Sequence, residues 1–144
     1  MNGVNVHTIP AMRKAWFGDD GLGYLVEADG VKIFYPGLHA PGNRKPEEIE
    51  KFRKEIDFLK THAPIDMVIL PIKGRHIHFR YQQYLYLIEQ LSPKAIYLIG
   101  DDLAKEEHLK CIETIKASKV PVFYPEGGIA AGKRFHYSRN SLLK

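Results

Sequence analysis

Residues 21–37, GLGYLVEADGVKIFYPG, give the clearest structural signal in this sequence. Two β-rich runs, one starting at Leu22 and one at Val31, lie on either side of Asp29-Gly30. This dipeptide readily takes the positive φ angles of a tight turn between two strands. The segment therefore predicts a β-hairpin.

Strands and amphipathic helices alternate after the hairpin. Pro46 opens a predicted helix, because a first-turn residue needs no N–H, and the apolar residues of that helix recur at three- and four-residue steps. Apolar runs at residues 67–72, 95–100 and 120–126 predict buried strands. Two more helices are expected between them, one over about residues 79–91 and one capped by Asp101 or Asp102, with Leu109, Ile112 and Ile115 inward.

A short first strand at residues 4–10 and an edge strand in the C-terminal tail complete the expected order. Strands that alternate with amphipathic helices are typical of layered α/β domains. The predicted fold class is therefore α/β, with a mixed β-sheet covered by three helices on one face.

The bulk composition places the chain among ordinary globular domains. Its 144 residues, 44% hydrophobic and 26% charged, suit one domain spanning 1–144. No apolar run approaches the roughly 18 residues of a membrane span, and the N-terminus lacks a signal-peptide pattern, so we expect a cytoplasmic protein without membrane contact. The net charge of +4 comes from interspersed charges, which does not favour nucleic-acid binding. Cys111, the only cysteine, excludes an intrachain disulfide and is expected to be a buried, inert thiol.

Three phrases and their order resemble the C-terminal half of the metallo-β-lactamase superfamily, nearest its lactonase-like, metal-dependent hydrolase branch. Residues 21–37 look like the hairpin whose second strand ends in a metal-binding Gly-Asp-Thr. IDMVILPIKG (residues 65–74) looks like the next strand, and LSPKAIYLIG (residues 91–100) looks like the strand that ends in a ligand histidine. The resemblance covers roughly residues 20–140. It implies one half of a four-layer αββα sandwich.

The family's metal ligands are missing from the matching positions. Gly37-Leu38-His39 stands where Gly-Asp-Thr is expected, Ile99-Gly100 stands where the histidine is expected, and no H-x-H-x-D-H cluster precedes the hairpin. A catalytic zinc needs about three protein ligands and an open position. The first hypothesis is therefore a degenerate, non-catalytic metallo-β-lactamase-like domain without a cofactor, which binds a small anionic ligand or a protein partner.

The alternative hypothesis is a hydrolase with a relocated metal site. His39, His76, His78 and Asp101 all follow the carboxyl ends of predicted strands, where covered α/β sheets usually carry their ligand sites. His76 and His78 could ligate one zinc ion, with His39, His7 or Asp101 as the third ligand. Such a site would activate water against an ester, a lactone or a phosphate. These residues are equally interpretable as polar loop and cap residues, and the chain could also be the C-terminal portion of a longer hydrolase.

One half of a two-sheet sandwich leaves the inner face of its sheet uncovered. An apolar face of that size is unusual on a monomer. We therefore expect a homodimer in which two copies pack sheet to sheet about a two-fold axis.

Overall fold

The structure, a computed structural model, describes residues 3–14, 20–37, 46–72, 77–100 and 106–124. The strands are β1 (Asn5–Lys14), β2 (Asp20–Ala28), β3 (Val31–Tyr35), β4 (Met67–Pro71), β5 (Ala95–Ile99) and β6 (Val122–Phe123). The helices are α1 (Pro46–Leu59), the short 3-10 helix η1 (Lys60–His62), α2 (Ile77–Leu91) and α3 (Glu106–Lys116). The edge strand expected in the C-terminal tail lies outside the described residues.

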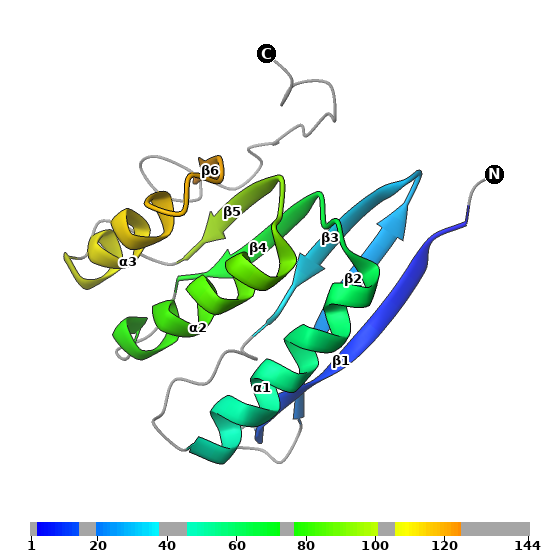
Figure 1. The fold of residues 1–144 in the computed structure, drawn as a ribbon, viewed down its shortest axis with the longest axis horizontal. Helices are drawn as coiled ribbons and strands as arrows, with labels where there is room; N and C mark the ends of the chain where they lie inside the picture. Colours follow the sequence, from blue (N-terminus) through cyan, green and yellow to red (C-terminus); the bar gives the residue numbers. More distant parts are fainter. Residues whose placement is uncertain (1–2, 15–19, 38–45, 73–76, 101–105, 125–144) are drawn as a thin grey trace.

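The six strands form one mixed sheet in chain order, from β1 to β6. β1, β2 and β3 pair antiparallel, and β3, β4, β5 and β6 pair parallel. Parallel neighbours that follow one another in sequence are joined by right-handed crossovers, which place the connecting helices on the same face. Figure 1 shows α1, α2 and α3 side by side on that face. The predicted mixed sheet with three helices on one face is confirmed.

The predicted hairpin is formed by β2 and β3. Asp29 and Gly30 have φ angles of 49° and 75°, the positive values that this two-residue turn requires. Ala28 pairs with Val31 directly beside the turn. The turn thus fixes the register, which places Leu25 and Phe34 together on the helix-covered face.

The hydrophobic core lies between the sheet and the helices. Leu25, Phe34, Val68, Leu70, Ile96 and Leu98 from the sheet pack with residues of α1, α2 and α3, and all six are fully buried. The helix contribution differs from the prediction at one position: Leu109 is 46% exposed, whereas Cys111 is buried. α2 also begins at Ile77, two residues earlier than expected, and β1 extends to Lys14.

The opposite face of the sheet carries no helix among the described residues. Because side chains alternate along a strand, the register places a second apolar set on this face. Its members are Val6, Tyr24, Val26, Ile33, Tyr35, Met67, Ile69, Ala95, Tyr97 and Phe123. We call this set the helix-free face.

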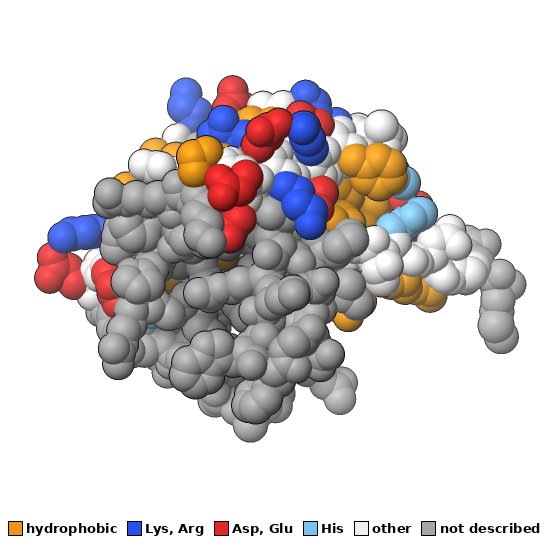
Figure 2. All heavy atoms as spheres, turned by 90° about the horizontal axis from the view of Figure 1, so that it is seen from below, with side chains coloured by type: hydrophobic (Ala, Val, Ile, Leu, Met, Phe, Trp, Pro, Cys, Tyr) orange, Lys and Arg blue, Asp and Glu red, His pale blue; other side chains and the backbone are white. Residues whose placement is uncertain are grey.

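Charged side chains lie mixed on the surface. In Figure 2, Lys and Arg alternate with Asp and Glu over the described part of the face shown, without an extended area of one sign. Two of the pairs follow the four-residue spacing of a helix, Glu50 with Lys54 and Glu106 with Lys110. Of the described helices, none has the length and apolar character to cross a membrane.

Candidate functional site

The site residues expected from the sequence all follow the carboxyl ends of predicted strands. β3, β4 and β5 end at one edge of the sheet, which we call the carboxyl edge and which is lower in Figure 1. His39, His76 and Asp101 lie outside the described residues. His78 lies in the first turn of α2, and its side chain is likewise not described. The relocated site therefore stays a prediction.

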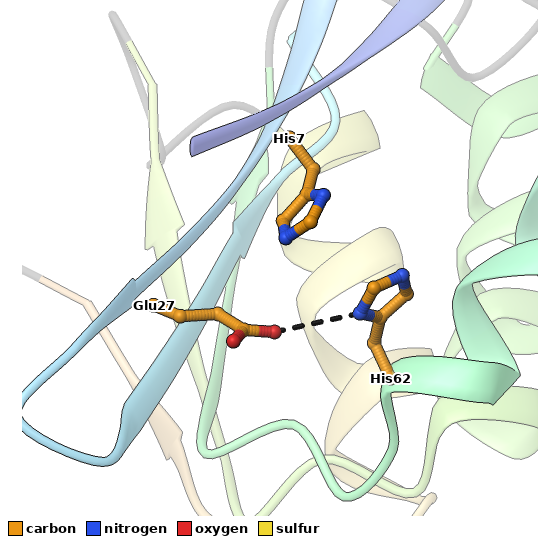
Figure 3. A group of neighbouring side chains, drawn as sticks. All are labelled: His7, Glu27 and His62. Atoms are coloured by element: carbon orange, nitrogen blue, oxygen red, sulfur yellow. Dashed lines mark ion pairs between the residues drawn. The ribbon is translucent and has the colours of Figure 1, made fainter. Parts of the chain in front are cut away.

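The opposite edge, which we call the amino edge, carries a group of three donor side chains. His7 comes from β1, Glu27 from the end of β2, and His62 from η1 just before β4. One ligand atom from each lies within 4.8 Å of the others. Figure 3 shows the three side chains converging from these elements. Imidazole and carboxylate are zinc ligands in proteins, so the group could hold such an ion.

Contacts among the three side chains fix their arrangement. Nδ1 of His62 lies 3.4 Å from Oε1 of Glu27. The rings of His7 and His62 have centroids 4.7 Å apart and are tilted by 53°. The side chains of Glu27 and His62 are 25% and 22% exposed, so water and ions can reach them.

A lysine competes for the same carboxylate. Nζ of Lys32 lies 3.8 Å from Oε1 of Glu27 and donates a hydrogen bond of 2.7 Å to the backbone oxygen of His62. Lys32 pairs with Glu27 across the hairpin, so the register of the turn places this ammonium beside the group. The amino edge thus combines a negative charge with a positive one. Any bound cation would have to compete with the Lys32 ammonium for the Glu27 carboxylate.

A buried carboxylate lies next to this group. Asp66 is 1% exposed, and its Oδ2 accepts a hydrogen bond of 2.8 Å from the backbone N–H of Lys32. Its Oδ1 accepts one of 2.8 Å from Nζ of Lys94. Asp66 thereby connects the beginnings of β3, β4 and β5. We interpret it as a residue that stabilises the sheet.

The helix layer offers a shallow hollow of about 480 Å³ between α1 and α2. Arg53 and Lys54 are among its lining residues, but Lys54 is 2.7 Å from Glu50 and the Arg53 guanidinium lies over the Tyr86 ring. These cations already have partners, and the acids beside them oppose an anion. The hollow gives no support to the expected small-anion ligand.

Cys111 does not offer a nucleophile. The thiol is fully buried, and this burial raises its pKa from 9.0 to about 12. A thiol attacks as the thiolate, which is almost absent at neutral pH when the pKa is so high. The expected buried, inert thiol agrees with this geometry.

Of the amino-edge group, only His7 was a candidate from the sequence, as a third ligand for a site built on His76 and His78. His7 instead lies beside Glu27 and His62. The sequence did carry a signal for this group. Glu27 lies two residues before the Asp29-Gly30 turn, and His62 lies at the end of the helical segment that precedes the next strand. Both positions fall where parallel strands begin.

Comparison with known proteins defines the class of fold. The α/β fold of the chain is similar to that of a solved structure. That structure is Igni18, described as a novel metallo hydrolase from the hyperthermophilic archaeon Ignicoccus hospitalis KIN4/I. The TM-score is 0.55 at 18% sequence identity, and the alignment covers 88% of this chain and 52% of that one. This chain thus matches about half the length of that protein.

The sequence comparisons do not assign the chain to a family. No family model matches the sequence, and no curated protein matches it.

Proposed function

We propose that this chain is a non-catalytic, metallo-hydrolase-like domain that binds a protein partner through the helix-free face, and that the partner is a second copy of the chain. The observation that carries the proposal is the composition of this face. Of the described side chains that the register places there, these ten are apolar or aromatic, and Thr8, which pairs with Tyr24, is polar but uncharged.

Met67 and Ala95 on this face are buried, at 4% and 0% exposure, but the exposure of other members favours an interface. Val6 and Tyr24 are 54% and 37% exposed, and Tyr35, Ile69 and Tyr97 are half-buried. Half-exposed apolar side chains still have surface to remove from water, at roughly 25 cal/mol per Å² of area buried. Tyrosine suits such a surface, because its ring is buried while its hydroxyl keeps a polar partner. The helix-free face can therefore gain free energy by association.

The absence of charge among the described side chains of this face favours a second copy as the partner. A two-fold axis brings each surface onto itself, so every charged residue near the axis meets its own kind. None of the ten residues of the helix-free face is Lys, Arg, Asp or Glu. Two such sheets can pack face to face about 10 Å apart without like-charge repulsion.

The non-catalytic part of the proposal rests on the resemblance noted in the sequence. Gly37 ends the segment after β3 with a φ angle of 58°, and Gly100 follows β5 directly. Where the resembled family has a ligand histidine at the end of that strand, a glycine offers no side-chain donor. A catalytic zinc site missing such ligands lacks the three that it needs.

The test is the state of association in solution. The wild-type chain should sediment as a dimer at concentrations on the order of tens of micromolar. Tyr24→Lys introduces a charge on the helix-free face and should give monomers, because the two-fold axis would bury two unpaired ammonium groups. Leu109→Lys is the matched control, since Leu109 is similarly exposed but lies on α3 in the helix layer.

Two outcomes would contradict the proposal. If the wild-type chain is a monomer in that concentration range, the partner is not a second copy of the chain. The helix-free face would then have to bind a different protein. Equal dissociation by Tyr24→Lys and Leu109→Lys would place the interface elsewhere.

The likeness to a metallo hydrolase favours one second candidate, a metal-dependent hydrolase of an ester, lactone or phosphate. Its site would be the carboxyl-edge residues His39, His76, His78 and Asp101. Zinc-dependent hydrolysis of a model ester that disappears in the His39→Gln/His76→Gln/His78→Gln variant would support it. Hydrolysis that is insensitive to these changes would remove it.

A further inference from the structure

We infer that His7, Glu27 and His62 form a zinc site at the amino edge, which fastens the outer strand β1 to η1 at the end of α1. This site is distinct from the hydrolase site considered above, because it lies at the opposite edge of the sheet. It is also independent of the proposed dimer, which uses the other face. The inference rests on donor chemistry, donor spacing and the elements that the donors join.

The donor set suits zinc. Two imidazoles and one carboxylate are a ligand combination that Zn²⁺ accepts, with a fourth position left for water. Ions that prefer thiolate ligands find none here, since the only cysteine of the chain, Cys111, is a buried residue of α3. Calcium and magnesium favour sets of oxygen ligands, of which this group offers only one side chain.

The spacing of the donors is near that of a coordinated ion. Zinc bonds of 2.0–2.2 Å at tetrahedral angles separate neighbouring donor atoms by about 3.4 Å. Nδ1 of His62 and Oε1 of Glu27 are 3.4 Å apart. The other donor pairs lie within 4.8 Å, so they need to close by little more than about 1 Å.

The site would join elements that are distant in sequence. His7 belongs to the edge strand β1, Glu27 to the hairpin, and His62 to η1 at the end of α1. Among the described strands, β1 lies at the end of the sheet and pairs with β2 alone. A bound ion would add a link between β1 and the helix layer, and binding to the folded state alone stabilises that state.

Lys32 sets the strength of the site. Its ammonium, 3.8 Å from Oε1 of Glu27, opposes a divalent cation at the same carboxylate. The backbone N–H of Lys32 bonds to Asp66, and a change of side chain leaves that bond in place. Lys32→Gln should therefore tighten zinc binding severalfold without disturbing the strand, an effect opposite in sign to loss of a ligand.

The experiment is a zinc titration of the full chain in competition with a chromophoric chelator. The wild type should bind one zinc ion at this site, and Glu27→Gln and His62→Gln should each weaken binding by about tenfold or more, because each removes one of three protein ligands. His39→Gln/His76→Gln/His78→Gln is the matched control. It removes three histidines of the carboxyl edge and should leave the affinity unchanged.

A second measurement tests whether the zinc ion binds next to β1. Hydrogen exchange of the β1 amides at Asn5–Thr8 should slow on zinc addition in the wild type and stay unchanged in Glu27→Gln. Circular dichroism of each variant confirms that it is folded before titration.

Three results would overturn the inference. The first is no zinc binding by the wild type at micromolar zinc. The second is a loss of affinity in the carboxyl-edge control with none in Glu27→Gln, and the third is weaker binding in Lys32→Gln. The second result would instead support the hydrolase candidate, so failure of one site is distinguishable from failure of the other.

Discussion

The two edges of the sheet differ in the chemistry of their described residues. At the amino edge, charged side chains gather: Glu27 lies between His62 and Lys32, and the buried Asp66 holds Lys94. At the carboxyl edge, the described contacts are backbone and neutral ones. The N–H of Ile72 donates to the oxygen of Ile99 at 2.6 Å, and the Tyr84 hydroxyl donates to the oxygen of Pro71 at 2.8 Å.

This difference separates fold from function. Covered α/β sheets usually carry ligand sites at the carboxyl ends of their strands, which is why the sequence analysis placed its candidates there. That regularity describes a class of folds, whereas a site depends on particular side chains. Here the described charged and ligating groups converge at the other edge. Substitutions at the two edges test whether this difference in charge is accompanied by a difference in their contribution to stability.

The largest effect is expected at the amino edge, for Asp66→Ala. This change leaves the Lys32 backbone N–H without its acceptor and the Lys94 ammonium without its carboxylate. Loss of one partner in a buried pair costs several kcal/mol, and since Lys94 is 43% exposed and can be hydrated, we expect about 3 kcal/mol. Urea unfolding at equilibrium measures it, and a loss below about 1 kcal/mol would show that Asp66 does not fasten this edge.

A smaller effect is expected at the carboxyl edge, for Tyr84→Phe. The change removes one buried hydroxyl and leaves the backbone oxygen of Pro71 without that donor, while the ring stays packed. A neutral hydrogen bond of this kind contributes about 1 kcal/mol. The same unfolding experiment gives the comparison. Equal losses at Tyr84 and Asp66 would mean that the contrast between the edges is one of charge alone and has no energetic counterpart.

Most of the fold was predictable from local patterns. The Asp29-Gly30 turn, the proline at the start of α1 and the three apolar strand segments each have a direct physical cause in the sequence. The error at Leu109 has a cause too. Both Leu109 and His108 lie one helical turn before Ile112, and the apolar residue looked like the inward one. The structure buries His108 and exposes Leu109, a choice made by packing against the sheet.

The candidate site was less predictable, because it depends on contacts between distant segments. His7 meets Glu27 only through the register of β1 on β2, and no tight turn fixes that register as Asp29-Gly30 fixes the next one. His62 reaches them from a 3-10 turn of three residues, too short to leave a periodic pattern. The carboxyl-edge candidates stay predictions, since they lie outside the described residues or lack described side chains.

At neutral pH the ionisation of Cys111 has the smallest effect on stability, and this thiol reports on the helix layer between the two edges. Burial holds the pKa of this thiol at about 12 instead of 9.0. At pH 8 the native thiolate fraction is then about a thousandfold below that of the unfolded chain, because each pKa unit is a factor of ten. Ellman's reagent should label the native thiol slower than the thiol in urea by at least that factor.

The same shift gives a pH dependence with a defined sign. Because the folded pKa lies above the unfolded one, the native thiol keeps its proton where the unfolded thiol has lost it. Its contribution to stability is therefore complete below about pH 9 and is lost as the pH rises toward about 12. Cys111→Ala should flatten this part of the unfolding profile at high pH. If the labelling rate rises in Asp66→Ala and not in Tyr84→Phe, the amino edge holds the helix layer in place; equal rates would assign the two edges the same role.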